Sequence, residues 1–298
     1  MIGSRRCGTV LLAAMFWLAA GLGTARDSAP ASARSTVRPA SAEPSVFRPQ
    51  PARPILGDLK YGRHADQRAD VYRPRWTARS SAAPVVVHGG GWRSGNKESW
   101  RDLSMQLAAA GFLVVAIDYR EATATYPGFP NQVEELEQAV TWIRGNARAW
   151  HVDPARVGAL GSSSGANLVA MLAFDGAGQL TSGARIKAAV TWSAPLDLTV
   201  QPWLSGPADF YVGCHTACTA KLVAASPMNY VSKGDTPIAM FNSADEAVPL
   251  AQVRQTAERL GADRVPYRLT VYPGSAHGTS YAQRAMPATI ALLTSQLS

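Results

Sequence analysis

Short apolar runs alternate with longer amphipathic stretches along the chain from Ile55 onward. Runs such as Val85 to Val87 and Val114 to Ile117 are continuously apolar, as parallel strands are when helices cover both faces of the sheet. The longer stretches repeat apolar residues every three or four positions, which is typical of helices. The alternation predicts an α/β fold with a doubly wound, mostly parallel sheet and helices on both faces.

The pattern also gives the extent of each element. The predicted strands are Leu56–Tyr61, Ala69–Tyr72, Pro84–His88, Leu113–Asp118, Val157–Gly161, Ile186–Trp192, Ile238–Asn242 and Tyr267–Tyr272. The predicted helices are Ser99–Ala110, Val133–Trp150, Ala166–Phe174, Leu250–Leu260 and Arg284–Leu297. An irregular insert, Pro195 to Pro227, interrupts this series and is expected to form a small cap. Its aromatic residues Trp203, Phe210 and Tyr211 fit a substrate-binding surface and a local core equally well. Ligands of such sheets bind beyond the carboxyl ends of the strands, so chemistry is expected just after strands.

The first 53 residues have a different character. Arg5 and Arg6 precede an apolar run from Val10 to Leu22, and small residues follow, which predicts a signal peptide cut after Ala25 and a secreted protein. The alternative is an uncleaved membrane anchor, but the run is shorter than the ~20 residues that span a bilayer, so cleavage and no stable membrane insertion afterwards are expected. Ser4, Arg5 and Arg6 are also compatible with a twin-arginine export signal, but Gly8 stands where such signals usually carry a large apolar residue, which weakens that interpretation. Residues 26–53 are rich in Ala, Pro, Ser and Arg and predict a disordered linker, leaving residues 54–298 as the catalytic domain.

The formal net charge of +8 is concentrated in that leading segment. Residues 1–53 hold seven Arg against Asp27 and Glu43, a net +5, which leaves +3 for the rest of the chain. A dispersed excess of this size lacks the clustered cations that follow a phosphate backbone, so nucleic-acid binding is not expected.

Three cysteines fit an exported protein. Cys7 would leave with the signal, and Cys214 and Cys218 remain as a close pair for which a disulfide is expected in an oxidising compartment. Two unlinked thiols are the alternative, because closing so short a loop restricts the unfolded chain only slightly. His215 lies beside the pair, but no second couple of ligands with zinc-site spacing accompanies it, so no metal is expected.

A GxSxG motif, Gly161 to Gly165, follows a predicted strand and precedes a predicted helix. In this context a sharp turn forces the central serine into a strained conformation that exposes its hydroxyl above the sheet. The flanking glycines allow the close backbone approach that such a turn requires. The motif predicts Ser163 as a nucleophile, with a small-residue loop as the alternative.

A second glycine-rich segment, His88-Gly89-Gly90-Gly91-Trp92, also follows an apolar strand. Backbone N–H groups of Gly90 and Gly91, together with that of Ser164, predict an oxyanion hole. The segment lacks the lysine and threonine of a nucleotide-binding loop, which disfavours a phosphate cradle. His88 is expected to support the loop by hydrogen-bonding backbone, and Trp92 to line the pocket wall.

His277 is the histidine best placed to act as a base. It follows the strand Tyr267–Tyr272 at the carboxyl edge, whereas His64 and His151 precede strands and His215 lies in the insert. The acid is expected in Asp245-Glu246, directly after Ile238–Asn242. Asp245 is preferred for its earlier turn position, and Glu246 is its only close rival. The order Ser163, Asp245, His277 is that of the α/β-hydrolase triad.

These motifs resemble the esterase and lipase branch of the α/β-hydrolases, which includes hormone-sensitive-lipase-like enzymes and bacterial feruloyl and acetyl-xylan esterases. The resemblance runs from about Gly57 to Leu297. The motifs that carry it are HGGGW, Asp118-Tyr119-Arg120, Val152 to Val157 before GSSSG, Asp245 with Val248-Pro249, and Tyr272-Pro273-Gly274 before His277-Gly278. It implies that Asp118 braces the oxyanion loop. The chain departs from the family at Ser162, at Ala166 and at Phe241-Asn242-Ser243, and the last change puts the packing of the acid loop in doubt.

The sequence therefore predicts a secreted serine hydrolase that cleaves small-molecule carboxylic esters through an acyl-enzyme on Ser163, without a cofactor. An amidase or formamide hydrolase would use the same residues. A non-catalytic binding module is a third interpretation, but such a module would normally lack a member of the triad. The sequence does not indicate the acyl group, the alcohol or the oligomeric state.

Overall fold

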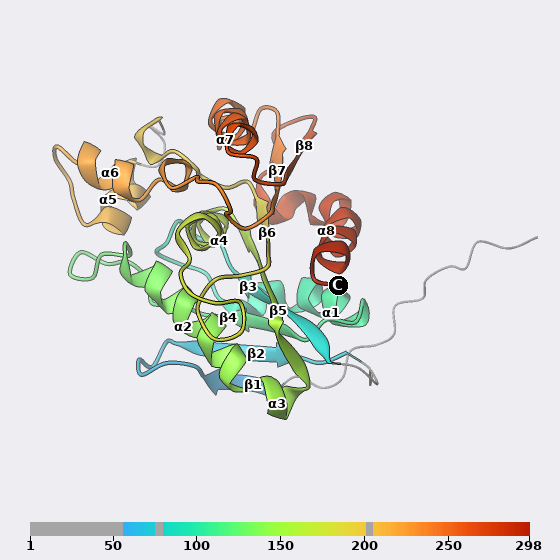
Figure 1. Cartoon of the computed structure of the whole chain (residues 1–298). Helices are drawn as coiled ribbons and strands as arrows, with labels where there is room; N and C mark the ends of the chain where they lie inside the picture. The colour runs from blue at the N-terminus through green and yellow to red at the C-terminus, as the bar shows by residue number, and fades with distance from the viewer. Residues whose placement is uncertain (1–55, 75–79, 201–204) are drawn as a thin grey trace, which may run out of the picture. The chain divides into compact units, whose positions relative to one another are not determined.

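The computed structural model describes residues 56–74, 80–200 and 205–298. The predicted signal peptide and linker and Trp203 lie outside these ranges. Within them, one eight-stranded sheet has the strand order β1-β2-β4-β3-β5-β6-β7-β8 (Figure 1). The strands are Leu56–Lys60 (β1), Arg68–Tyr72 (β2), Ser81–Val87 (β3), Val114–Ile117 (β4), Val152–Ser162 (β5), Ala188–Trp192 (β6), Ile238–Ser243 (β7) and Tyr267–Tyr272 (β8).

Most of the sheet is parallel. β1 pairs with β2, and β2 with β4, in antiparallel fashion, while the pairings from β4 through β3, β5, β6 and β7 to β8 are parallel. Val87 pairs with Gly161, and Gly161 in turn pairs with Thr191. The carboxyl ends of the central strands therefore meet at one edge, where the predicted site residues follow them.

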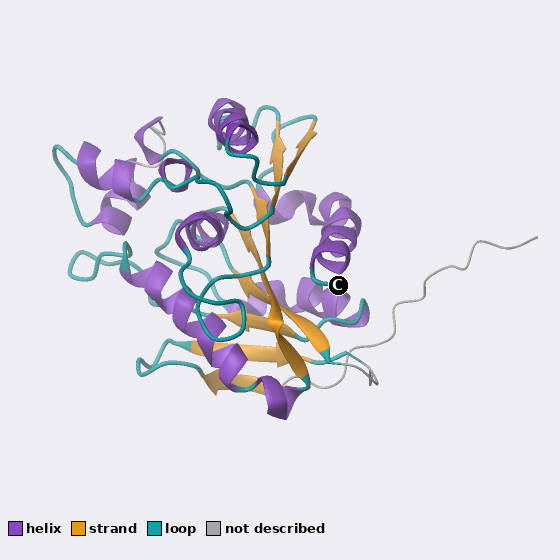
Figure 2. Cartoon of the chain, viewed as in Figure 1, coloured by secondary structure: helices purple, strands orange, loops and turns teal. Residues whose placement is uncertain are grey.

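Two hydrophobic cores lie on opposite faces of this sheet. Val85 and Val87 of β3 point into one core and Val86 into the other, as the two-residue period of a strand requires. Figures 1 and 2 show α1 and α8 on one side of the strands and α2, α3 and α4 on the other. The helices are Arg101–Ala109 (α1), Asn131–Gly145 (α2), Ala147–Trp150 (α3), Ser164–Asp175 (α4), Ser205–Val212 (α5), Thr219–Ala224 (α6), Leu250–Ala262 (α7) and Ala282–Gln296 (α8). The predicted doubly wound α/β architecture is confirmed.

Two elements differ from prediction. The single helix expected over 133–150 is divided into α2 and α3 at Asn146, whose side-chain Nδ2 donates to the Trp142 carbonyl at 2.9 Å. Gly145 and Asn146 are poor helix formers, and such local side-chain bonds compete with the helix. The insert is not irregular throughout, because it contains α5 and α6. Helices this short carry too few apolar repeats to stand out in the sequence.

No helix in the described ranges combines the length and the apolar character that crossing a bilayer would need.

Candidate active site

The Ser163 turn joins β5 to α4. Ser163 has φ 54° and ψ −122°, a strained conformation for a residue with a side chain. A Cβ on Gly161 would lie 2.3 Å from the Gly165 carbonyl oxygen, and one on Gly165 would lie 2.3 Å from that of His88. The turn therefore fits only with glycine on either side of it. The Ser163 N–H donates to the Trp192 carbonyl at 2.8 Å, which ties the turn to the end of β6.

His277 reaches this serine from the loop after β8. The distance from His277 Nε2 to Ser163 Oγ is 2.9 Å, within hydrogen-bond range. The imidazole is about one-third exposed, so it can exchange protons with a molecule entering from solvent. The structure thus brings together the predicted nucleophile and base, which lie 114 residues apart in the sequence.

Glu246, not Asp245, faces the other imidazole nitrogen. Glu246 Oε2 lies 2.5 Å from His277 Nδ1, and its side chain is fully buried. The prediction of Asp245 at this place is wrong. A turn over residues 244–245 leaves Asp245 exposed, with its N–H donating to the Gly274 carbonyl at 3.1 Å, and the chain then returns Glu246 toward the histidine. The turn position that favoured Asp245 in the sequence is the position that directs it to solvent.

Glu246 has partners on both carboxylate oxygens. Oε1 accepts from the Ser243 N–H at 2.7 Å and from the Ser193 hydroxyl at 2.9 Å, while Oε2 faces His277. An anion facing Nδ1 holds the proton of a neutral imidazole on that nitrogen, which leaves Nε2 as an acceptor for the Ser163 hydroxyl.

The glycine loop lies beside the serine. A Cβ on Gly89 would lie 3.1 Å from Ser163 Cβ, and the φ values of Gly90 (134°) and Gly91 (62°) favour glycine. The Gly90 carbonyl accepts from Ser94 Oγ at 2.9 Å and from the Arg93 N–H at 3.3 Å. Because the peptide is planar and trans, the Gly91 N–H points the opposite way.

The N–H groups predicted to form the oxyanion hole are available. In the part of the chain that the structure describes, the amides of Gly90, Gly91 and Ser164 have no hydrogen-bond acceptor. Ser164 begins α4, and the first N–H groups of a helix point out of its end. Free amides on the glycine loop and at this helix start are the groups that stabilise negative charge on a substrate oxygen.

His88 and Asp118 hold the loop from behind. His88 is 2% exposed, contacts the Gly89 carbonyl oxygen through Nδ1 at 2.9 Å and stacks on Tyr119 at 4.3 Å between ring centroids. Burial lowers the pKa of His88, so its ring is neutral and Nδ1–H donates to that carbonyl. Asp118 accepts from the Lys97 N–H at 2.6 Å and lies 3.0 Å from Lys97 Nζ, which fixes the far end of the loop. These contacts match the supporting roles expected of both residues.

Trp92 does not line an open pocket wall as predicted. Its side chain is 0% exposed and stacks on Tyr211 of α5, with ring centroids 4.4 Å apart. Gly91 lies against Pro207, and the Arg93 guanidinium lies 3.6 Å from the Phe210 ring centroid. The indole is buried because three successive loop residues pack against one helix of the insert.

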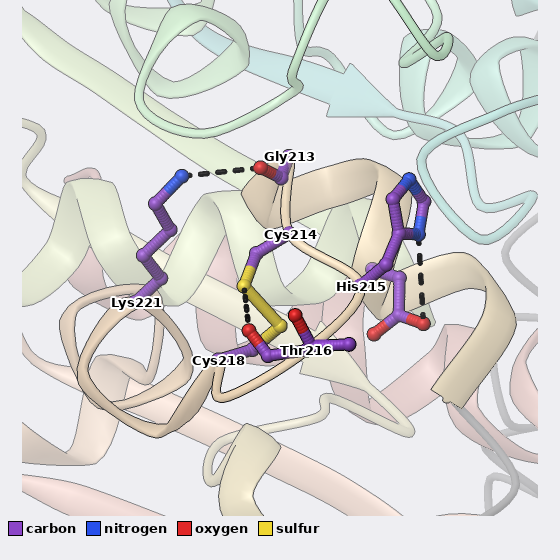
Figure 3. Close-up of a disulfide and its surroundings, with 7 residues drawn as sticks. Gly213, Cys214, His215, Thr216, Cys218 and Lys221 are labelled. Carbon is purple, nitrogen blue, oxygen red and sulfur yellow. Dashed lines mark hydrogen bonds and ion pairs between the residues drawn. A yellow bond between two sulfur atoms is a disulfide. The ribbon is translucent and has the colours of Figure 1, made fainter.

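Cys214 and Cys218 follow α5 and flank a short turn. Their sulfur atoms are 2.20 Å apart, and Figure 3 draws the pair as a disulfide. The Cys214 N–H donates to the Asp209 carbonyl at 2.9 Å. Figure 3 shows Lys221 Nζ donating to the Gly213 carbonyl, at 3.1 Å. His215 faces Asp209 at 4.0 Å. No cluster of three potential metal ligands occurs in the described ranges.

Two residues of the site were not singled out in the sequence. Ser193 and Tyr281 lie behind Glu246, and Ser193 comes directly after β6. A polar residue immediately after a strand, at the carboxyl edge, is the signal that would have marked Ser193. Tyr281 lies in a short helical turn after His277, and its sequence context carries no comparable signal.

Several known proteins are similar to this chain in sequence. The model of the BD-FAE family matches residues 69–260, more than half of the chain. Esterase LipQ of Mycobacterium tuberculosis (strain ATCC 25618 / H37Rv) is 25% identical over 239 residues, which cover 70% of this chain and 54% of LipQ. The probable isoprenylcysteine alpha-carbonyl methylesterase ICMEL1 of Oryza sativa subsp. japonica is 36% identical over 118 residues, 39% of this chain and 27% of that protein. The chain thus spans about a quarter to a half of these two curated relatives.

Solved structures show the same fold. A truncated carbohydrate esterase from gut microbiota superposes with a TM-score of 0.74 at 20% identity, covering 83% of this chain and 97% of that one. An esterase of Thermogutta terrifontis, Est2, with propionate bound, gives a TM-score of 0.67 at 24% identity, covering 80% of this chain and 94% of that one. Together with the family match and the esterase relatives, this fold confirms the predicted resemblance to the esterase and lipase branch of the α/β-hydrolases.

Proposed function

The chain belongs to the BD-FAE family, and from that premise we propose that it is a serine esterase that cleaves carboxylic esters of small molecules through an acyl-enzyme on Ser163. The observation that carries the proposal is the chain of contacts from Ser163 Oγ to His277 Nε2 at 2.9 Å and from His277 Nδ1 to Glu246 Oε2 at 2.5 Å. A nucleophile, a base and an orienting anion in this order support acyl transfer. The relatives are named esterases and methylesterases, which supports ester bonds as the target.

In the first step Ser163 Oγ attacks the ester carbonyl carbon while His277 Nε2 takes the hydroxyl proton. The carbonyl π electrons move to the oxygen, and the amides of Gly90, Gly91 and Ser164 stabilise the resulting anion. Removing one such donor in other enzymes costs about 3 to 4 kcal/mol of transition-state stabilisation. The Glu246 carboxylate stabilises the imidazolium that has formed.

The tetrahedral intermediate then collapses. The bond to the alcohol oxygen breaks, the alcohol leaves with the proton from His277 Nε2, and an ester links the acyl group to Ser163. Water enters, gives a proton to Nε2 and attacks the acyl carbon, and the collapse of the second intermediate returns that proton to Ser163 Oγ as the acid leaves. The chemistry uses side chains and backbone amides of this chain alone.

We further propose that the protein is exported and that Cys214 and Cys218 are bonded in the exported form. The apolar run after Arg5 and Arg6 supports export, and an oxidising compartment favours the bond. Mass spectrometry of the secreted protein tests both proposals, because it reads the new N-terminus and the two-hydrogen mass difference of the bonded pair.

Ser163→Ala tests the function directly. The variant should lose at least about a thousandfold in kcat toward p-nitrophenyl acetate while keeping the wild-type melting temperature, since only the nucleophile is removed. Ser162→Ala is the matched control, because it removes the neighbouring hydroxyl and leaves Ser163 in place. A fluorophosphonate should label the wild type at Ser163, and an active Ser163→Ala variant would refute the proposal. The same assay with the matched anilide separates an esterase from an amidase.

A further inference from the structure

We infer that Ser193 is a positioning residue of the site, whose hydroxyl holds the Glu246 carboxylate against His277. The inference rests on the proposed function, because it gives Ser193 a part in the same reaction. Ser193 touches none of the reacting atoms described above. It acts through Glu246, whose Oε1 lies 2.9 Å from Ser193 Oγ.

Ser193 stands where several loops of the site meet. Its side chain is fully buried, and its own N–H donates to the Phe241 carbonyl of β7 at 2.8 Å. The preceding residue, Trp192, accepts from the Ser163 N–H at 2.8 Å. The Gly278 N–H, one residue after the base, donates to Ser193 Oγ at 2.8 Å. Two adjacent residues at the end of β6 thus contact the nucleophile turn, the neighbouring strand and the histidine loop.

The backbone at Ser193 is strained in a way that serves these contacts. Its φ is 55°, in the left-handed region that residues with side chains rarely adopt. Strain of this kind persists where the surrounding structure over-determines it, and it is frequent at functional sites. At this position the hydroxyl can meet Glu246 while the backbone N–H stays paired with β7.

Tyr281 lies beside the Ser193 hydroxyl and leaves its proton to Glu246. Its OH lies 2.9 Å from Ser193 Oγ and 2.9 Å from the Phe241 carbonyl oxygen. Burial raises the pKa of Tyr281, so the phenol keeps its proton. An ionised Glu246 only accepts hydrogen bonds, so the Ser193 proton goes to Oε1. The Tyr281 hydroxyl then donates its proton to Ser193 Oγ or to the Phe241 carbonyl.

The network also gives a reason why a glutamate works in this loop. Ser193 Oγ and the Ser243 N–H both bind Oε1, which leaves Oε2 for His277. With Oε1 held on two sides, the longer and more flexible glutamate side chain keeps one orientation. Without Ser193, the carboxylate would lose one of these restraints and the imidazole would be oriented less well.

Ser193→Ala tests the inference, because alanine removes the hydroxyl but carries a Cβ as serine does, so the strain of the positive φ is unchanged. We expect kcat for p-nitrophenyl acetate to fall roughly 10- to 100-fold, the range for losing a hydrogen bond to a charged group, with KM changed less than about twofold. In a Glu246→Ala background the same substitution should cost less than about threefold, since Ser193 acts through Glu246.

Thr191→Val is the matched control. It removes a buried hydroxyl two residues earlier, within β6, that donates to the Ala239 carbonyl at 3.5 Å, and it should leave kcat within about twofold of wild type. The inference is overturned if Ser193→Ala keeps wild-type kcat, if it loses no more than Thr191→Val, or if it loses as much in the Glu246→Ala background.

A second measurement does not depend on turnover. The His277 Nδ1–H proton should give a low-field NMR resonance that is absent in His277→Ala and moves in Ser193→Ala, while Thr191→Val leaves it in place. A wild type that hydrolyses no ester would defeat the proposed function, and this resonance would still decide the inference. Movement in Ser193→Ala would support it, and an unchanged resonance would overturn it.

Discussion

The two sides of the Ser163 hydroxyl are held by different forces. On the histidine side, the Glu246 side chain is fully buried and hydrogen-bonded through both carboxylate oxygens. On the oxyanion side, the amides of Gly90 and Gly91 are placed by glycine conformations and by aromatic packing of Trp92 on Tyr211. Hydrogen bonds to a charged group are directional and depend on single atoms, whereas stacking depends on volume and area. We therefore expect substitutions on the two sides to act differently on activity and stability.

The largest effect is expected on the hydrogen-bonded side. Glu246→Gln keeps the shape of the side chain but removes the charge opposite Nδ1, so kcat should fall about 10³- to 10⁴-fold with little change in KM. Asp245→Asn is the matched control, because this neighbour is exposed, and it should stay within about twofold of wild type. Kinetics with p-nitrophenyl acetate measure both variants. The reverse order of effects would return the orienting role to Asp245.

A smaller loss in activity, but a larger one in stability, is expected on the stacked side. Tyr211→Ala empties a buried site against Trp92 and should lower the free energy of unfolding by about 3 to 5 kcal/mol. The loosened loop should lower kcat roughly tenfold. Tyr211→Phe keeps the stack, and because the Tyr211 hydroxyl has no hydrogen-bond partner among the described residues, it should be neutral or stabilising by about 1 kcal/mol. Urea unfolding and kinetics together test the pair. Equal effects of the two substitutions would show that the stack does not hold the loop.

The smallest effect is a pH dependence on the same side. Burial lowers the pKa of His88 below its ordinary 6.5. Below that pH, His88 therefore binds a proton in the unfolded chain that it does not bind in the folded chain. The free energy of unfolding should therefore fall as the pH drops below 6.5, down to the folded pKa, by at most about 1.4 kcal/mol per pH unit from this group. Urea titrations between pH 4.5 and 7.5 measure the slope. His88→Gln should flatten it, and an unchanged slope in that variant would assign it to other groups.

The sequence could predict the features that depend on neighbouring residues, but not those that depend on contacts between distant segments. Alternating apolar runs define the sheet and both helical layers because period and length are local properties. Ser163 and His277 were predictable because a sharp turn and a position after a strand are local too. The choice between Asp245 and Glu246 depends on how one turn directs two adjacent side chains. That direction is settled by a local contact with Ser243 and by contacts with Ser193 and His277 from distant segments. The burial of Trp92 likewise depends on α5, more than a hundred residues further along the chain.

The short span between Cys214 and Cys218 has a practical consequence for making the protein. A bond across four positions removes little freedom from an unfolded chain of this length, about 2 kcal/mol by loop entropy. The Tyr211 stack and the backbone contact between Phe129 and Tyr211 hold the neighbouring helix independently of the sulfur atoms. Production in a reducing bacterial cytosol, with both thiols free, should therefore yield folded enzyme suited to the assays above.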